Sequence, residues 1–401
     1  MDSLRPSVRF ALIGGCPFFE RVPASNSANN NKYIPTEAAI CAKIYTPMNK
    51  KIRVKVVGAT GYGGLGIIDL LLRHPYAEIG ALVAREDAGK KISDVYPHLA
   101  GYCDQMILAA DDPAAQGNFD LVFFSTPDRV GMADAKAELA KGAKVIDYSG
   151  DFRFTTLAAY QDYATRLGKD PNHLSPELLG TNVYGLPELH RADIAKANLV
   201  GNPGCFATSC ILGLAPAMKA HLVAPHSVIC DCKSGVSGAG KKPKPQFHYP
   251  ERCEQINAYR LSGHQHVCEV ERELSLQGGE DVKLIFTAQV LPISRGILST
   301  LYGDLIQDVT EEDVLAIYRD FYKDSAFVRV LPSTASTGTM SVRGTNRCEI
   351  VVSVDKRVGK LRIVSIIDNL VKGQAGQALQ NMNVMFGLPE NTGLNLPGMY
   401  P

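Results

Sequence analysis

Short runs of β-branched and other apolar residues recur through the first half of the chain, and longer stretches with helical spacing separate them. Buried parallel strands have this composition, because both of their faces are covered. One separating stretch, residues 129–141, is rich in alanine and has the spacing of a helix. The alternation predicts a doubly wound parallel sheet within residues 51–204. The expected strands are residues 52–57, 78–84, 121–125, 144–148 and 197–200.

The second half of the chain begins with a long helical stretch, residues 206–220, and is then rich in strands. Two pairs of apolar strands are each joined by a short link, which is typical of antiparallel hairpins. A further helix is expected at residues 311–322. We predict a second, α+β domain over residues 205–367 with a mixed or antiparallel sheet, followed by a last helical segment, residues 368–401. The expected strands are residues 226–233, 282–292 with 297–306, and 348–354 with 361–367.

The charges of the chain are balanced. There are 42 Lys and Arg residues against 41 Asp and Glu residues, and the basic residues form no block. Nothing in this balance indicates nucleic-acid or membrane-surface binding, and no apolar run approaches the roughly 20 residues of a spanning helix. The ten cysteines include no C-x-x-C pair. We therefore expect a reducing compartment in which most thiols are inert core residues.

Residues 1–50 differ in composition from the rest. They hold several serines, a patch of asparagines and few acidic residues, without sustained periodicity. Organelle transit peptides are poor in acidic residues and contain serine. Two interpretations stay open: a transit peptide or its remnant, and a flexible tail or packed N-terminal arm.

A glycine turn follows the first expected strand and precedes a helix at residues 65–73. Strand, glycine turn and helix are the context of a dinucleotide-binding fingerprint, although the spacing here, G-x-x-G-x-x-G, is a variant. Gly58 and Gly61 would let the backbone turn tightly and approach a phosphate, while the helix N-terminus supplies N–H donors. A glycine turn that binds nothing is the alternative.

Two strand ends add to the expected cofactor site. Arg85 follows the second strand, where an acidic residue prefers NAD and an arginine accommodates the 2′-phosphate of NADP. Arg85 therefore favours NADP, although Glu86 and Asp87 follow it and an exposed arginine without a ligand is the alternative. Ser125 ends another strand on the ligand side of the sheet, where it could contact the cofactor.

Residues 201–208 form a glycine-proline corner at which an apolar strand ends and a helix begins, with Cys205 at the corner. The unpaired N–H groups and the dipole of a helix N-terminus favour an anion. We therefore expect the pKa of the Cys205 thiol to fall and its thiolate to act as a nucleophile. The alternative is that Cys205 is one small buried hydrophobe among ten cysteines.

A histidine pair precedes a charged helix expected at residues 269–274. His264 and His266 are two residues apart, so one or both face the thiol, depending on where the helix starts. If the helix includes His266, Glu269 lies one turn further on and could orient its imidazole. A metal-binding pair would lack a third ligand with clear spacing, so we expect no metal. Two solvated histidines at a helix start are the alternative.

An irregular polar stretch, residues 149–190, is long enough to be functional or to cover an active site. Arg153 within it could bind a carboxylate or phosphate through two parallel hydrogen bonds, and a salt bridge to Asp151 is the alternative. Ser149, at the start of the stretch, and Tyr259, ahead of the histidine pair, are further candidates for substrate contacts.

Residues 201–208, which read GNPGCFAT, closely resemble the active-site signature of the N-acetyl-gamma-glutamyl-phosphate reductase family, the arginine-pathway branch of the semialdehyde dehydrogenase superfamily. Motifs at residues 58–64, 185–189, 263–266 and 368–373 match the same family, and the resemblance covers about residues 52–400. It departs from the family at Ser209 and at Val267 with Cys268. It implies that Cys205 is the catalytic cysteine, that His264, His266 and Glu269 bind substrate and transfer protons, and that Thr60, Gly61, Tyr62, Gly63, Arg85 and Asn369 contact NADP.

The resemblance also implies an activity: reduction of an acyl phosphate by NADPH through a cysteine thioester. In the family the first domain binds NADP(H), the second carries substrate and subunit contacts, and homodimers or homotetramers are the rule. Plant members act in the chloroplast, which would explain residues 1–50; the cytoplasm is the other expectation. A relative acting on a lysine-branch or aspartyl acyl phosphate stays open, as does a Cys/His thiol hydrolase or acyltransferase that needs no nicotinamide.

Overall fold

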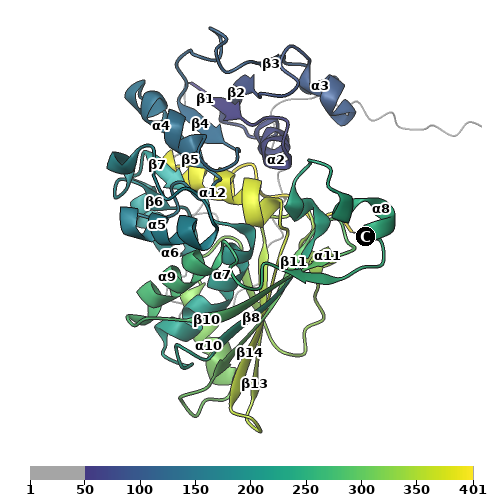
Figure 1. The fold of residues 1–401 in the computed structure, drawn as a ribbon. Helices are drawn as coiled ribbons and strands as arrows, with labels where there is room; N and C mark the ends of the chain where they lie inside the picture. The colour runs from purple at the N-terminus through teal and green to yellow at the C-terminus, as the bar shows by residue number, and fades with distance from the viewer. Residues whose placement is uncertain (1–49, 401) are drawn as a thin grey trace, which may run out of the picture. The chain divides into compact units, whose positions relative to one another are not determined.

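The computed structural model describes residues 50–400, which contain two seven-stranded β-sheets flanked by helices (Figure 1). The expected N-terminal extension, residues 1–50, lies outside the described residues except for Lys50. The first sheet has the strand order β3-β2-β1-β4-β5-β7-β6, and all of its strands are parallel. The predicted doubly wound parallel sheet is therefore confirmed. Its strands are β1 (Ile52–Val57), β2 (Ala77–Val83), β3 (Ile107–Leu108), β4 (Leu121–Phe124), β5 (Lys144–Asp147), β6 (Val183–Tyr184) and β7 (Leu199–Gly201).

The helices of the first sheet differ from expectation at two places. Helix α2 starts three residues earlier than predicted, because Tyr62 and the turn glycines Gly63 and Gly64 form its first turn. The stretch at residues 149–190, expected to be irregular, contains two helices and the edge strand β6, so the prediction of a continuous loop is wrong. The helices of this part are α2 (Tyr62–Leu71), α3 (Ile92–Val95), α4 (Gly131–Ala140), α5 (Leu157–Arg166) and α6 (Pro187–Ile194), with short 3₁₀ turns at Pro97–Leu99 and Pro176–Leu178.

The second sheet is mixed, with the strand order β12-β13-β14-β11-β8-β10-β9. Strands β13 and β14 form the expected antiparallel hairpin. The other expected hairpin is wrong: β10 and β11 both pair with β8, which lies between them, so the link at residues 292–296 crosses the end of β8. The strands are β8 (Val228–Gly235), β9 (Asn257–Tyr259), β10 (Leu284–Leu291), β11 (Ile297–Asp304), β12 (Val328–Leu331), β13 (Cys348–Asp355) and β14 (Lys360–Ile367).

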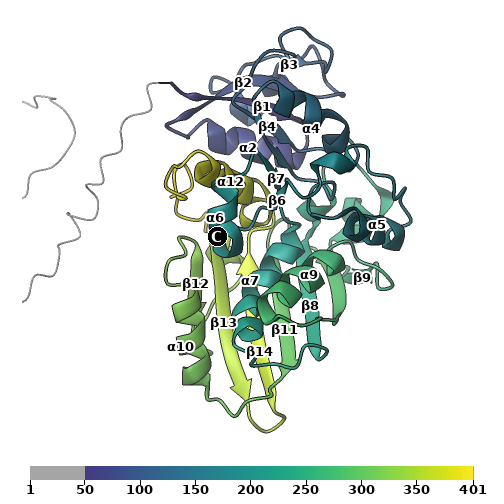
Figure 2. The same cartoon turned by 90° about the vertical axis from the view of Figure 1, so that its left-hand side faces the viewer.

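Among residues 50–400, helices cover one face of the second sheet. The long helix α7 packs against β11 and β14, and α9 packs against α7 (Figure 2). Residues on the other face, such as Ile229 and Ile285, which pair in register, are exposed. The helices of this part are α7 (Cys205–Lys219), α8 (Tyr249–Arg252), α9 (Val267–Gly278), α10 (Glu311–Phe321) and α11 (Thr339–Val342), with 3₁₀ turns at Val236–Ala239 and Pro245–Phe247.

The last helix, α12 (Gly376–Met385), returns to the first sheet, as its yellow ribbon shows in Figure 1. Its apolar residues Leu379 and Met382 share one buried cluster with Ile67 and Ile68 of α2. A π-helical turn, Val371–Ala375, leads into α12 from the end of β14. The end of the chain therefore passes between the cysteine helix α7 and the glycine turn. Among residues 50–400, no helix has the length and apolar composition needed to cross a membrane.

Candidate active site

The glycine turn after β1 is packed so closely that side chains are excluded. Gly58 has φ +82°, and a Cβ there would lie 2.2 Å from the carbonyl oxygen of Ser125. A Cβ on Gly64 would lie 2.2 Å from the carbonyl oxygen of Gly58, and one on Gly63 would lie 2.3 Å from the Ser125 hydroxyl oxygen. No side chain caps α2, whose N-cap is Gly61, so the N–H groups of its first turn are unpaired. This is a backbone cradle of the kind that binds a phosphate.

The other expected cofactor residues lie around this cradle. The Thr60 carbonyl accepts a hydrogen bond of 2.8 Å from the Tyr96 hydroxyl, and Tyr62 lines a cavity with the loop after β8. Arg85 is exposed just beyond the end of β2. The structure thus brings Thr60, Tyr62 and Ser125 to the edge at which the parallel strands end, where doubly wound sheets bind their ligands.

Asn369 is placed differently from the expected cofactor contact. Its carboxamide is buried; the oxygen accepts from the Gly296 N–H at 2.7 Å and the nitrogen donates to the Ser237 hydroxyl at 2.9 Å. Both of these partners belong to the second sheet and its loops. Asn369 therefore holds the loop after β8 against the link between β10 and β11, and its amide is already engaged.

Two buried polar atoms beside the cradle have no hydrogen-bond partner within the described part of the chain: the Thr126 hydroxyl oxygen and the Gln374 amide oxygen. The Thr126 methyl is 3.2 Å from where a Cβ on Gly58 would lie, and the Gln374 amide nitrogen is 2.8 Å from where one on Gly63 would lie. Buried polar atoms are rarely left unpaired in a native protein. Free donors, unpaired acceptors and a side-chain-free turn together fit a bound dinucleotide.

Cys205 is the first residue of α7, and no side chain caps this helix. Cys205 forms no disulfide among residues 50–400. Gly373, in the π-helical turn before α12, lies so close that a Cβ there would be 2.8 Å from the Cys205 Cβ. The predicted position of this cysteine at a strand-to-helix corner is confirmed.

The predicted fall in the pKa of the Cys205 thiol is wrong. Burial raises the pKa of Cys205 to about 11, and the Phe206 N–H and the positive charge of Arg153 oppose this only in part. The helix N-terminus does favour the thiolate, but loss of hydration outweighs it when the surrounding space is closed by protein. The thiol is therefore protonated near neutral pH and needs a base.

A cavity of 380 Å³ connects the cysteine to the histidine pair. It is bounded by α7, the loop after β8, strand β9 and the start of α9. Tyr259, an expected substrate contact, faces this cavity as well, and its ring meets that of His264 edge to face. The residues that line it and carry chemistry are Cys205, Lys244, Tyr259, Arg260, His264 and His266.

His264 is held by aromatic packing. Its ring stacks on Phe286 at 4.7 Å and meets the rings of Phe206 and Tyr259 edge on. Its Nδ1 accepts a hydrogen bond from the backbone N–H of His266, so the proton of the neutral ring is assigned to Nε2. Burial lowers the pKa of His264 to about 2, and the ring is neutral at physiological pH.

His266 lies against the residue that precedes the cysteine. Its Nε2 is 2.1 Å from where a Cβ on Gly204 would lie, and it also accepts from the Gln265 amide at 3.3 Å. Its Nδ1 is buried and has no partner among residues 50–400. Burial and the positive charge of Arg153 hold the pKa of His266 well below its ordinary value. His266 lines the same cavity as Cys205, and its imidazole is neutral at physiological pH, the form that can accept a proton.

The expected hydrogen bond from Glu269 to His266 is not formed. Glu269 is fully buried, and it accepts from the Arg153 guanidinium at 2.7 Å, the Tyr184 hydroxyl at 3.0 Å and the Gly204 N–H at 3.1 Å. His266 is the N-cap of α9, and both side chains approach Gly204 without a hydrogen bond between them. Glu269 therefore positions the corner before Cys205 instead of orienting the imidazole.

Arg153 and Ser149 are engaged within the protein. Arg153 is buried and donates to Glu269 and to the carbonyls of Asn202 and Tyr148, so it is not positioned to bind a substrate, and it makes no salt bridge to Asp151 among the described residues. The Ser149 hydroxyl donates to Asp147. Both expected substrate contacts are better described as supports of the corner and of the sheet edge.

Two family models match this chain. One described as "Semialdehyde dehydrogenase, NAD binding domain" matches residues 53–197, and one described as "Semialdehyde dehydrogenase, dimerisation domain" matches residues 205–369. The N-acetyl-gamma-glutamyl-phosphate reductases of Pelotomaculum thermopropionicum and Desulforamulus reducens are both 44% identical to it, over 354 and 351 residues. These matches cover 87% of this chain and 99% and 100% of the relatives. The chain belongs to the N-acetyl-gamma-glutamyl-phosphate reductase family.

Solved structures of more distant proteins share the fold. Aspartate semialdehyde dehydrogenase II from Vibrio cholerae, complexed with ASA, matches with a TM-score of 0.63 at 16% identity, over 84% of this chain and 99% of its own. Aspartate semialdehyde dehydrogenase with NADP from Candida albicans matches with a TM-score of 0.60 at 15% identity, over 86% of this chain and 100% of its own. At these identities the likeness extends to the fold alone.

Two positively charged side chains that line the cysteine cavity were not predicted from the sequence. Lys244 and Arg260 are exposed residues that line the cysteine cavity. Arg260 has φ +49°, which is rare for a side-chain-bearing residue and frequent at functional sites, and it donates to Gln265 at 2.6 Å. A lysine-rich loop and an arginine next to Tyr259 are visible in the sequence, but only the fold brings both to Cys205.

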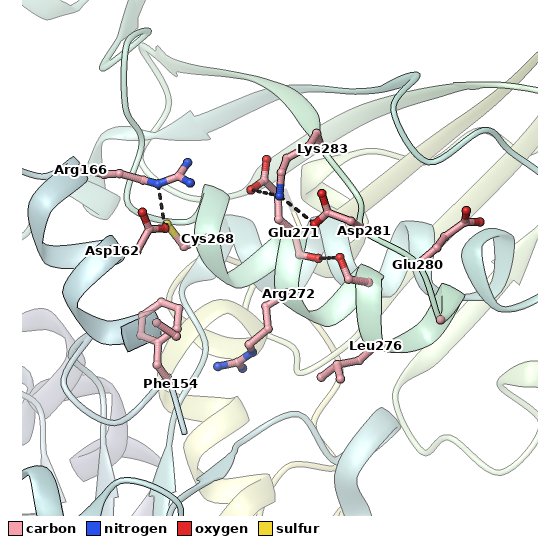
Figure 3. Close-up of a pocket in the computed structure, with 13 residues that line it drawn as sticks. Phe154, Asp162, Arg166, Cys268, Glu271, Arg272, Leu276, Glu280, Asp281 and Lys283 are labelled. Atoms are coloured by element: carbon pink, nitrogen blue, oxygen red, sulfur yellow. Dashed lines mark hydrogen bonds and ion pairs between the residues drawn. The ribbon is translucent and has the colours of Figure 1, made fainter. Parts of the chain in front are cut away.

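A second cavity, of 630 Å³, lies on the other side of the N-terminal turn of α9, between α5 and α9 (Figure 3). Its charged side chains neutralise one another: Arg166 pairs with Asp162 at 2.9 Å, and Lys283 pairs with Asp281 at 2.9 Å. Cys268 faces it, and burial raises the pKa of this thiol to about 11. Cys205 does not line this cavity, so we place the chemistry of the reductase family at the smaller one.

No cluster of three or more potential metal ligands occurs among residues 50–400.

Proposed function

We propose that this protein catalyses the NADPH-dependent reductive dephosphorylation of N-acetyl-gamma-glutamyl phosphate to N-acetylglutamate 5-semialdehyde, the third step of arginine biosynthesis. The observation that carries the proposal is a cavity that joins Cys205, at a helix N-terminus, to a neutral His266 and two cations. Family membership and 44% identity to two enzymes of that name support it.

The first half of the reaction uses the cysteine. His266 takes the proton of the Cys205 thiol, and the thiolate attacks the carbonyl carbon of the acyl phosphate. The unpaired N–H groups at the start of α7 stabilise the negative charge on the carbonyl oxygen, an effect worth about 3 kcal/mol per donor in other enzymes. Lys244 and Arg260 bind the phosphate, which leaves as the thioester forms.

The second half releases the aldehyde. NADPH, when bound at the glycine turn, supplies the hydride that reduces the thioester carbon. The imidazole that accepted the thiol proton donates it to the developing oxygen. It takes the proton back when the thiohemiacetal collapses, so that the carbonyl of the aldehyde forms and Cys205 leaves as the thiolate. We assign this proton to His266, because His264 is locked between three aromatic rings.

The choice of NADP over NAD rests on charge at the end of β2. Arg85 is exposed there, and Lys242 of the loop after β8 forms an ion pair of 3.1 Å with Glu86. A 2′-phosphate is recognised by cations in this position. Comparing the dissociation constants of NADP and NAD for the purified protein tests this part of the proposal.

The uncovered face of the second sheet is proposed as the contact with a second copy. It exposes Ile229 and Ile285 side by side, and the match to the dimerisation domain spans this sheet. Sedimentation analysis should give a dimer or tetramer, and Ile285→Lys should shift it toward the monomer.

A plastid location is proposed on the composition of residues 1–50 alone, since the relatives named above are bacterial. A fluorescent protein fused after residue 50 should accumulate in chloroplasts; a cytoplasmic signal would refute this part.

The reverse reaction tests the activity. N-acetylglutamate semialdehyde, phosphate and NADP should give absorbance at 340 nm, and aspartate semialdehyde should give at least tenfold less. Cys205→Ser should abolish turnover while NADP binding is retained. A Cys205→Ser variant with more than about a tenth of wild-type activity would exclude the covalent route. A thiol hydrolase would produce no change at 340 nm, and the missing Glu269–His266 hydrogen bond also disfavours it.

A further inference from the structure

The side chain of Gln374 lies between the glycine turn and the reactive cysteine. Its amide nitrogen is 2.8 Å from where a Cβ on Gly63 would lie. The residue before it, Gly373, is in contact with Cys205, since a Cβ there would be 2.8 Å from the Cys205 Cβ. Two consecutive residues, Gly373 and Gln374, therefore contact Cys205 and the glycine turn, respectively.

The oxygen of the Gln374 carboxamide is unpaired. It is buried and has no hydrogen-bond partner within residues 50–400. In contrast, the Gln374 backbone carbonyl accepts from the side-chain amide of Asn202 at 3.1 Å. The main chain is therefore fixed while the amide oxygen is unpaired. A buried amide oxygen without a partner costs free energy, so its position calls for a ligand.

The backbone around Gln374 is held in place by hydrogen bonds and an ion pair. The π-helical turn is closed by hydrogen bonds from the Gly373 and Ala375 N–H groups to the carbonyls of Asp368 and Leu370. Asp368 is buried and receives an ion pair of 3.0 Å from Arg295. Single π-helical turns add one residue to a helix and often occur at functional sites. This turn places the Gln374 side chain beside Gly63 of the glycine turn.

We propose that the Gln374 carboxamide binds the carboxamide of the nicotinamide ring and thereby fixes which face of the ring meets the substrate. This inference rests on the proposed function. The reacting carbon is attached to the sulfur of Cys205, and hydride transfer requires the ring within about 3.5 Å of it. The glycine turn holds the pyrophosphate at the other end. The ring therefore lies where Gln374 is, and two primary amides pair through complementary N–H and C=O groups.

The test measures cofactor binding without turnover. Titration calorimetry gives dissociation constants of the full-length protein for NADPH and for 2′-phosphoadenosine 5′-diphosphoribose, which lacks the nicotinamide ring. Gln374→Met, of similar length but without hydrogen-bonding groups, should weaken NADPH binding roughly tenfold and leave the ring-free ligand unchanged. Gln377→Met is the matched control: it removes a buried glutamine of α12 that donates to the Gly185 carbonyl, and it should change both affinities equally or not at all.

Each other outcome overturns the inference. Equal weakening of both ligands by Gln374→Met would assign the amide to the ribose or pyrophosphate. Unchanged or tighter NADPH binding would mean that the side chain only fills the space. If the wild type bound neither ligand, the proposed function itself would fail, and the two failures are thus distinguishable. Thermal melting of both variants checks that the fold is retained.

Discussion

Gly204→Ala is predicted to disable the enzyme by displacing one imidazole. Gly204 has φ −71° and ψ 147°, a conformation that any residue adopts, so alanine brings no backbone strain. Its Cβ, however, would lie 2.1 Å from Nε2 of His266. To restore an ordinary contact the ring must move by about 1.3 Å, and displacements near 1 Å cost about 100-fold in rate, or about 2.7 kcal/mol of activation free energy. We expect kcat to fall by about that factor.

The reverse reaction at 340 nm measures kcat, and calorimetry measures NADP affinity, which should stay within about twofold. The double variant Gly204→Ala with His266→Ala should be no slower than His266→Ala alone, since both act on the same ring. Gly338→Ala is the matched control: Gly338 is also a helix N-cap, but a Cβ there meets nothing within 4 Å. A Gly204→Ala enzyme within tenfold of wild type, or losses that add in the double variant, would refute the role of His266.

Three further predictions follow from buried ionisable groups. The pKa of Cys205 near 11 predicts that iodoacetamide alkylation of this residue in the free protein, followed by mass spectrometry, accelerates about tenfold per pH unit between about pH 7 and about pH 9; a plateau near neutral pH would show a lowered thiol pKa instead. Burial, with Asp151 nearby, raises the pKa of Asp147 well above the ordinary carboxyl value. The folded protein then holds this proton more tightly than the unfolded chain, and the resulting stability is present at low pH and lost as the pH rises. Asp147→Asn lacks that dependence, so its free energy of unfolding relative to wild type should increase by about 1 kcal/mol or more from about pH 4 to about pH 8 in urea titrations; a constant difference would contradict the shift. Lys372 and Glu188 form an ion pair of 2.7 Å with no exposed side-chain surface. Lys372→Met leaves the carboxylate unpaired and should lower the free energy of unfolding by about 3–5 kcal/mol, while Lys372→Met with Glu188→Gln should recover part of it; equal losses in both would argue against the pair.

Local patterns were sufficient for most elements of the two sheets. Strand β1, the glycine turn and the start of α7 follow from composition and spacing over fewer than ten residues. The strand pairing of the second half did not follow, because β8 enters between β10 and β11 from a distant part of the chain. A short link between two apolar strands favours a hairpin only when no third strand competes for the same edges.

The candidate site likewise contains features that local sequence predicts and features that depend on distant segments of the chain. The positions of Cys205 at a strand-to-helix corner and of His266 at a helix start follow from the sequence, because both are local features. The contact between Arg153 and Glu269 does not, because these residues meet across 116 residues. Their pairing depends on how the segment after β5 meets α9, which no local pattern records.

The amino-acid sequence by itself determined the fold class, the family and the position of Cys205 at a strand-to-helix corner, since each depends on short motifs and on hydrophobic periodicity. Only the tertiary structure decided that the thiol is protonated, that Glu269 supports the corner before Cys205, and that the Gln374 amide oxygen stands unpaired beside the cradle. The physical reason is that protonation and hydrogen bonding depend on burial and on charges supplied by distant segments, which exist as neighbours only after the chain has folded.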